Sequence, residues 1–144
     1  NNCKIIFEPG RSIIGNVGIL ISKIIYIKKN KNKNFVILDA AMNDLMRPAL
    51  YGTKHQIIPS IKNKKTINKM FEFVGPICES TDRFLTVSKF QNLKEGDILL
   101  ICDVGAYGLS LGSNYNVRPL PAEILIKNSK ILTIKNRQKL SDII

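Results

Sequence analysis

The stretch Leu93-Lys94-Glu95-Gly96-Asp97-Ile98-Leu99-Leu100-Ile101 shows the pattern that decides the fold: a short polar turn leads into an apolar run. The same alternation continues along the chain. Short, β-branched apolar runs are separated by turns rich in Gly, Asn, Pro or Lys, and this pattern favours strands over helices. We therefore predict a mainly β protein whose bulk forms a closed or sandwich-like barrel.

The predicted strands are the apolar runs at residues 4–7, 19–27, 35–38, 69–74, 84–87, 98–103, 123–126 and 131–134. The last two runs flank the polar tip Lys127-Asn128-Ser129-Lys130, which suits a hairpin turn. Helix is expected only in two short pieces, near residues 45–51 and 106–113.

A chain of 144 residues, 44% hydrophobic and 23% charged, has the size and composition of one globular domain. No apolar run approaches the roughly 20 residues that span a bilayer, and no signal peptide opens the chain, so no membrane association is expected. Cys3, Cys78 and Cys102 cannot all pair, which favours a reducing, cytoplasmic compartment. The chain starts without an initiating Met and soon enters an apolar run, so we expect a fragment.

The net charge of +11 raises the question of a nucleic-acid partner. Lys far outnumbers Arg and stands among Asn and Ile, a composition that A+T-rich codons produce. The densest patches, residues 28–34 and 62–65, fall between apolar runs, where we predict solvated loops, and no aromatic residue interleaves with them. We expect no nucleic-acid partner. A stand-alone basic β-domain that binds nucleic acid remains the alternative from another class.

Several common sites are absent from the sequence. His55 is the single histidine, and no Cys or His stands at metal-ligand spacing, so we expect no metal. The glycine-rich phosphate loops and the G-x-S-x-G nucleophile motif are also missing. We expect His55 to be a polar loop or edge-strand residue.

Polar clusters stand instead at the predicted loops. They are Glu8-Pro9-Gly10-Arg11 and residues 46–51, 75–82, 103–108 and 113–119. Three arginines of this lysine-rich chain lie in these clusters close to a proline. Because a guanidinium fork binds a carboxylate or a phosphate through two hydrogen bonds, the clusters together predict a small anionic ligand.

Five motifs stand in order along the chain: EPGR (8–11), DAAMNDLMRPALYG (39–52), VGPICESTD (74–82), GDILLICDVGAYG (96–108) and SNYNVRPLPAE (113–123). Together they resemble the C-terminal part of the diaminopimelate decarboxylase family. The resemblance covers essentially the whole chain. The family consists of two-domain pyridoxal 5'-phosphate enzymes with an alanine-racemase-like barrel. The resemblance implies that residues 1–15 end a (β/α)8 barrel with its last strand, and that residues 16–144 form the C-terminal β-barrel or sandwich domain.

The resemblance also implies cofactor contacts. Glu8 would lie against the pyridine nitrogen, where a carboxylate keeps the ring protonated. Pro9, Gly10 and Arg11 would lie along the cofactor, with Arg11 also reaching a substrate carboxylate. Tyr107 would stand near both the cofactor phosphate and the substrate.

The substrate contacts implied by the resemblance involve four further residues. Arg47 and Tyr51 would hold the distal carboxylate of the substrate. Cys78 would protonate the carbon from which CO2 has left, since a free thiol with a pKa of about 8.5 is largely protonated at neutral pH. Glu79 would bind the distal ammonium group.

The implied reaction is decarboxylation of meso-2,6-diaminopimelate to L-lysine and CO2, in lysine biosynthesis. In this family the Cys-Glu loop enters the partner subunit's active site, which implies a homodimer. The lysine that holds the cofactor belongs to the barrel segment, so the isolated chain should be inactive. A carboxynorspermidine decarboxylase, or another diamino-acid decarboxylase on this scaffold, is the alternative enzyme. Ornithine and arginine decarboxylases typically have Asp after this Cys and lack the Arg-Pro-x-Leu-Tyr pattern.

Overall fold

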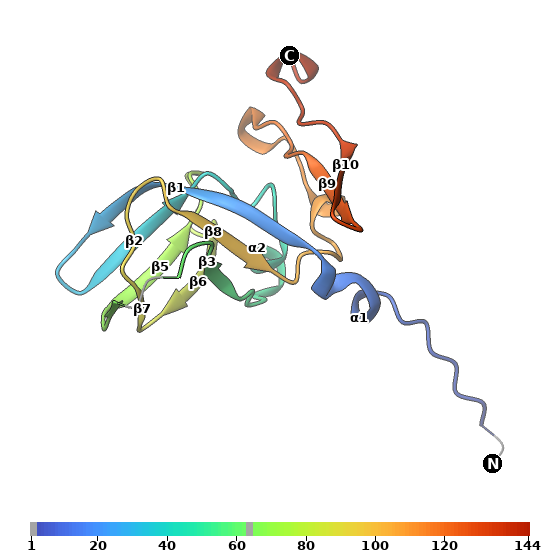
Figure 1. Cartoon of the computed structure of the whole chain (residues 1–144), viewed down its shortest axis with the longest axis horizontal. Coiled ribbons are helices and arrows are strands. Elements are labelled where there is room, and N and C mark those ends of the chain that lie inside the picture. Colours follow the sequence, from blue (N-terminus) through green and yellow to red (C-terminus); the bar gives the residue numbers. More distant parts are fainter. Residues whose placement is uncertain (1–2, 63–64) are drawn as a thin grey trace.

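A computed structural model describes residues 3–62 and 65–144 (Figure 1). Asn1 and Asn2 of the predicted barrel segment, and Asn63 and Lys64 of the second lysine-rich patch, lie outside the described residues. The elements in chain order are α1 (Arg11–Ile14), η1 (Gly15–Val17), β1 (Ile19–Lys29), β2 (Lys33–Leu38), α2 (Arg47–Tyr51), β3 (Ile57–Pro59), β4 (Thr66–Ile67), β5 (Met70–Val74), β6 (Arg83–Val87), β7 (Phe90–Gln91), β8 (Ile98–Cys102), η2 (Leu109–Leu111), η3 (Tyr115–Val117), β9 (Glu123–Lys127), β10 (Lys130–Lys135) and η4 (Leu140–Asp142).

The main sheet has six strands in the order β3-β8-β1-β2-β5-β6. Every neighbouring pair runs antiparallel except β2 and β5, which are parallel. Two smaller sheets, β4–β7 and β9–β10, complete the strands. The main sheet curls into half a barrel, and the mainly β prediction is confirmed (Figure 1). None of the described helices is long and apolar enough to cross a membrane.

Along the strands of this sheet, successive side chains point to opposite faces, and those on the concave side pack together. In β2, Asn34, Val36 and Leu38 point inward, as the two-residue period of a strand requires. Phe73 of β5 packs edge to face on Phe90, with ring centroids 4.9 Å apart. Such aromatic pairs add about 0.5–1.5 kcal/mol beyond the area they bury. The core therefore lies inside the curl of the sheet and leaves the functional loops at its margins.

The predicted strands other than residues 4–7 are confirmed to within two residues at each end. The short strands β3, β4 and β7 were not predicted. The first lysine-rich patch is not entirely a loop, because β1 extends to Lys29 and β2 starts at Lys33. The turn between them is closed by the Asn30 N–H, which donates to the Lys33 carbonyl over 2.9 Å. Lys29 is exposed there, whereas the Lys33 ammonium group donates to the Glu72 carboxylate on the neighbouring strand β5.

The predicted hairpin at the C-terminal end is confirmed. β9 and β10 pair antiparallel, with Lys127 opposite Lys130. Asn128 and Ser129 both have positive φ, 50° and 60°, which is the geometry of a two-residue type I′ turn.

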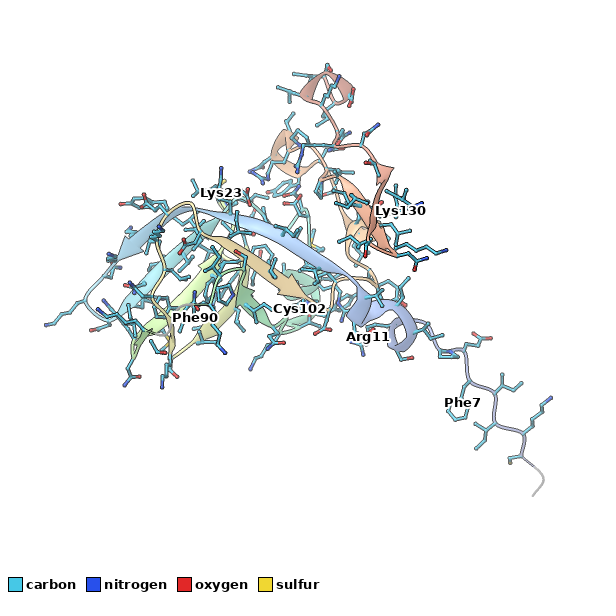
Figure 2. The ribbon with its side chains drawn as sticks, in the orientation of Figure 1. Phe7, Arg11, Lys23, Phe90, Cys102 and Lys130 are labelled. Atoms are coloured by element: carbon cyan, nitrogen blue, oxygen red, sulfur yellow. The ribbon has the colours of Figure 1, made fainter. Side chains whose placement is uncertain are left out.

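Two sequence predictions were wrong. Residues 4–7 form no strand, because a strand needs a hydrogen-bonded neighbour and the described chain offers none here. Figure 2 shows Phe7 on a segment that leaves the sheet domain, beyond Arg11. The helix predicted at 106–113 is reduced to the three-residue turn η2, since Tyr107 has a φ of 56° and glycines flank the turn. The short helix near residues 45–51 is confirmed as α2.

Candidate functional site

Two glycines bring the N-terminal segment against the loop that follows β8. An ideal Cβ on Gly105 would lie 2.0 Å from the Ile14 carbonyl oxygen, and one on Gly18 would lie 2.3 Å from the Gly105 nitrogen. The Gly105 N–H donates to the Gly15 carbonyl over 2.9 Å, and the Val104 N–H donates to the Gly18 carbonyl over 3.0 Å. Only residues without a side chain allow this backbone contact.

The contact places Tyr107 close to Gly10 and Arg47. An ideal Cβ on Gly10 would be 3.9 Å from the Tyr107 hydroxyl. The Arg47 guanidinium carbon lies 5.9 Å from the centroid of the Tyr107 ring, within the range of a cation–π contact. Tyr107 is half exposed and holds a φ of 56°, a left-handed conformation that costs a non-glycine residue about 1–3 kcal/mol. Residues from three separate segments thus meet at one place.

Arg47 is the most unusual of these residues, because it is buried without a carboxylate partner. It starts α2, is 7% exposed, and makes no ion pair within residues 3–62 and 65–144. Its Nε is buried and has no hydrogen-bond partner in the described part of the chain. A buried unpaired cation is costly, so this position calls for an anion from outside the chain.

The other residues assigned around Arg47 are exposed. Tyr51 ends α2, and Arg11 starts α1 on the side of the molecule where β8 ends (Figure 2). Glu8 precedes Arg11 in a segment without regular structure, as does Pro9. Across residues 3–62 and 65–144, no hydrogen bond or ion pair joins these side chains to Arg47.

Cys78 and Glu79 lie on a separate loop, residues 75–82. Asp82, at the end of this loop, forms hydrogen bonds with the backbone within it. The Gly75 N–H donates to the Asp82 carbonyl over 3.0 Å and closes the neck of the loop. The buried Asp82 carboxylate accepts the Ile77 N–H through Oδ2 at 2.8 Å. Cys78 and Glu79 are both exposed at the tip.

Tyr115 is a residue of this site that the sequence analysis left without a role. Its hydroxyl donates to Glu79 Oε1 over 2.6 Å, and this hydrogen bond, together with the Glu79 charge, raises the pKa of Tyr115. The motif SNYNVRP contained the residue, but no pattern in the sequence pairs it with Glu79.

Arg118 lies in one of the polar clusters but was given no cofactor or substrate role, and the structure shows it in an internal one. Its Nε donates to Asn43 Oδ1 over 3.1 Å, and its Nη2 donates to the Asp39 carbonyl over 2.5 Å. The same Nη2 lies 3.7 Å from Asp44 Oδ2. Arg118 thus ties the loop before α2 to the loop that carries Tyr115.

His55 is more buried than predicted. It lies just before the edge strand β3 and is 5% exposed. Its Nδ1 is 2.9 Å from the Cys102 carbonyl, so Nδ1 carries the proton in this hydrogen bond. Within the described residues, no group of three or more potential metal ligands is found.

A groove of about 530 Å³ runs beside the assigned residues, between α2 and β6. Ser80 and Thr81 contribute to its lining, but Arg47, Cys78 and Tyr107 do not. Tyr51, Cys78 and Tyr107 stand on an open surface, whereas Arg47 is buried beneath it. Ligand sites usually enclose most of a small ligand.

Burial raises the pKa of Asp44 above its ordinary value of 3.8, although the Ala41 N–H and Arg118 oppose this change. The folded state then binds the proton more tightly than the unfolded state. The contribution of this carboxyl to the free energy of unfolding is therefore largest below pH 3.8 and declines as the pH rises through the raised pKa.

We accordingly expect Asp44→Asn to gain stability relative to the wild type as the pH is raised from below 3.8. Urea unfolding at a series of pH values measures the difference. The attraction between ionised Asp44 and Arg118 acts only above the pKa, and its opposing effect is already contained in the net rise of the Asp44 pKa. A difference that is constant with pH, or that changes in the opposite direction, contradicts the prediction.

Comparison with known proteins identifies relatives of this chain. Residues 12–105 match the family described as the C-terminal sheet domain of pyridoxal-dependent decarboxylases. The diaminopimelate decarboxylase of Zymomonas mobilis is 45% identical over 142 residues, which is 99% of this chain and 33% of that protein. The chain spans about a third of the length of the curated relatives it matches.

Solved structures agree with this match. The diaminopimelate decarboxylase of Helicobacter pylori, complexed with L-lysine, superposes with a TM-score of 0.86 at 44% identity, over 94% of this chain and 33% of that one. The diaminopimelate decarboxylase of M. jannaschii gives a TM-score of 0.89 at 37% identity, over 94% and 31%.

Proposed function

Because the chain belongs to the pyridoxal-dependent decarboxylases, through their C-terminal sheet domain, we propose that it is the C-terminal part of a diaminopimelate decarboxylase. The reaction is the removal of CO2 from meso-2,6-diaminopimelate to leave L-lysine, the compound bound to the Helicobacter pylori relative. The observation that carries this proposal is Arg47, a buried guanidinium with no acidic partner among the described residues. A substrate carboxylate supplies the missing anion.

The residues present fit pyridoxal phosphate. The Tyr107 hydroxyl lies beside Gly10, and a phenol hydroxyl is a hydrogen-bond donor suited to the cofactor phosphate. Glu8, Pro9, Gly10 and Arg11 are the other residues proposed to hold the cofactor. When bound, the cofactor withdraws electrons from the carbon that loses CO2. The carboxylate of Glu8 favours the protonated ring nitrogen on which this withdrawal depends.

The chain's own residues bind the substrate at both ends and supply a proton. Arg47 and Tyr51 hold the distal carboxylate, and Arg11 reaches the carboxylate nearer the cofactor. Glu79 binds the distal ammonium group through the carboxylate oxygen that Tyr115 leaves free. Cys78 donates a proton from Sγ to the substrate carbon after CO2 departs.

Exposed apolar side chains support a larger assembly, in which a barrel segment and a second copy of the protein complete the site. They include Ile5, Ile6, Phe7, Ile13, Ile14, Val17, Ile19, Ile21, Ile25, Ile124, Leu125, Ile126, Ile131, Leu132 and Ile134. Six of them lie on the paired strands β9 and β10, and apolar surface gathered in this way marks protein contacts. We place the domain boundary after residue 15, with residues 1–15 in the barrel, and the enzyme in the cytoplasm, where its three free thiols stay reduced.

A hybrid enzyme tests the function. The chain replaces the corresponding C-terminal third of the Zymomonas mobilis decarboxylase, and we expect the hybrid to form L-lysine and CO2 from meso-2,6-diaminopimelate. The parent Zymomonas mobilis protein is the positive control. A hybrid that folds and binds pyridoxal phosphate but decarboxylates only carboxynorspermidine, or another diamino acid without a distal carboxylate, overturns the assignment.

Arg47→Lys in the hybrid is expected to raise KM for diaminopimelate about 10-fold, equivalent to about 1.4 kcal/mol, with a smaller change in kcat. Lysine keeps the charge but loses the two-pronged contact with the carboxylate. Initial rates over a range of substrate concentration measure both constants. Arg137→Lys, an exposed arginine near the C-terminus, is the matched control. An unchanged KM removes Arg47 as the carboxylate ligand.

A further inference from the structure

Asp82 makes a second contact, to a segment distant in the sequence. While Oδ2 accepts the Ile77 N–H, Oδ1 accepts the Met42 N–H at 2.7 Å. Met42 lies in the loop that leads to Arg47, five residues further along the chain. One carboxylate therefore joins the loop carrying Cys78 to the segment that presents Arg47.

This carboxylate is fully enclosed. Asp82 is 3% exposed, and an ideal Cβ on Gly75 would lie 2.2 Å from its Oδ2 and 2.4 Å from its Oδ1. The absence of a side chain at Gly75 is what leaves room for the carboxylate. Ile77 is also buried, so the loop is anchored by one apolar side chain and by one charged group. A buried carboxylate that accepts two backbone hydrogen bonds specifies a single position for the backbone around it.

We propose that Asp82 is a positioning residue that holds the Cys78–Glu79 loop at a fixed place relative to the Arg47 segment. This inference rests on the proposed function, in which Cys78 donates the proton, Glu79 binds the ammonium group and Arg47 binds the carboxylate. Asp82 touches no reacting atom. It sets the spacing between groups that must act on the two ends of one substrate, and an error of about 1 Å in such spacing can cost a hundredfold in rate.

Asp82→Asn in the hybrid enzyme tests this role with little change of shape. The amide has only one acceptor oxygen, so one of the two backbone N–H groups loses its partner. We expect kcat/KM for diaminopimelate to fall about 30-fold or more, with a lower kcat because Cys78 is displaced and a higher KM because Glu79 is displaced. The assay is run well below the melting temperature of the variant, so that loss of folded protein does not contribute.

The matched control is Asp97→Asn. Asp97 also accepts a backbone N–H, that of Lys94 at 2.9 Å, in the turn before β8. We expect its kcat/KM to stay within 3-fold of the wild type. If a folded Asp82→Asn enzyme keeps kcat and KM within 3-fold of the wild type, the positioning role is overturned.

Hydrogen–deuterium exchange separates the failure of this inference from the failure of the proposed function. In the hybrid without substrate, Asp82→Asn is expected to speed exchange of the Ile77 and Met42 amides about 10-fold, while Asp97→Asn leaves them unchanged. If the wild-type hybrid does not act on diaminopimelate, the proposed function fails, whereas this result still decides whether Asp82 holds the loop. Unchanged exchange overturns the inference even in an active enzyme.

Gly75→Ala tests the close contact between Gly75 and the Asp82 carboxylate by changing the glycine instead of the aspartate. In the presence of Asp82 its methyl group meets the carboxylate, and we expect a loss of kcat/KM similar to that of Asp82→Asn. In an Asp82→Ala background every side-chain atom beyond Cβ is gone, and the same substitution should change kcat/KM less than 3-fold. Fully additive effects of the two substitutions overturn the contact as the cause.

Discussion

Cys78→Ala is expected to lower kcat of the hybrid enzyme on diaminopimelate by about 10²–10⁴-fold, the usual contribution of a positioned acid. Alanine keeps the backbone and the hydrogen bonds that Asp82 makes around the loop, but it has no proton to donate. Cys78 is exposed at the loop tip, where its thiol is available to a substrate bound against another surface. The readout is the initial rate of L-lysine formation at saturating substrate.

The pyridoxal phosphate content of the variant, measured from its absorption spectrum, should equal that of the wild type, since Cys78 is not among the residues proposed to hold the cofactor. KM should change little, because Glu79 and Arg47 remain. Cys3→Ala is the matched control: Cys3 is also an exposed free thiol, outside the loop, and its variant should turn over normally. Wild-type rates from Cys78→Ala, with full cofactor content, remove Cys78 as the proton donor.

The long strands were predictable because each of them carries its own local signal. Apolar β-branched runs between polar turns marked the long strands, and the Asn128-Ser129 tip marked the hairpin. Short edge strands such as β3 lack such a signal and form only when a neighbour presents its backbone. The same physics explains the error at residues 4–7, where an apolar run has no described strand to pair with. Periodicity reports which residues favour a strand, and pairing depends on the rest of the fold.

Some residues of the candidate site could likewise be named from the sequence, whereas their hydrogen-bond partners could not. The resemblance supplied Arg47, Cys78 and Glu79 as candidates, and their roles remain predictions. The hydrogen bonds from the Met42 N–H to Asp82 and from the Tyr115 hydroxyl to Glu79 join residues 36 or more positions apart in the sequence. No spacing rule within a strand or turn connects such positions, so these partners become visible only when the loops are placed in space. Arginines near prolines also proved ambiguous, since Arg47 is unpaired whereas Arg118 binds its own chain.

Gly105→Ala is expected to cost about 2–4 kcal/mol of stability, combining the strain of overpacking with the loss of one or two hydrogen bonds. The added methyl group would meet the Ile14 carbonyl oxygen at 2.0 Å, and backbone cannot move aside as a flexible side chain can. To relieve the clash, α1 and η1 must separate from the loop after β8. That separation breaks the hydrogen bond from the Gly105 N–H to Gly15 and moves Gly10 away from Tyr107.

Gly15→Ala is the matched control, because it makes the same substitution on the other side of this contact. Gly15 has helical angles, φ −55° and ψ −48°, and its added methyl group would lie 3.4 Å from the flexible Arg11 Cγ. Alanine at such a position is expected to stabilise by about 0.4–1 kcal/mol, since it restricts the unfolded chain. Urea unfolding gives the two changes in stability, and hydrogen exchange at Val104 reports whether the segment has separated.

If the segment before β1 is docked as described, the two alanine variants shift stability in opposite directions, and in the hybrid only Gly105→Ala loses pyridoxal phosphate. The loss of cofactor follows because Gly10 and Tyr107 are proposed to hold it jointly, and neither residue is itself altered. Equal effects of the two substitutions would mean that residues 11–17 do not rest on the loop after β8. The two halves of the proposed cofactor site would then lack the glycine contact that, beyond the end of the β1–β8 pairing, brings Gly10 close to Tyr107.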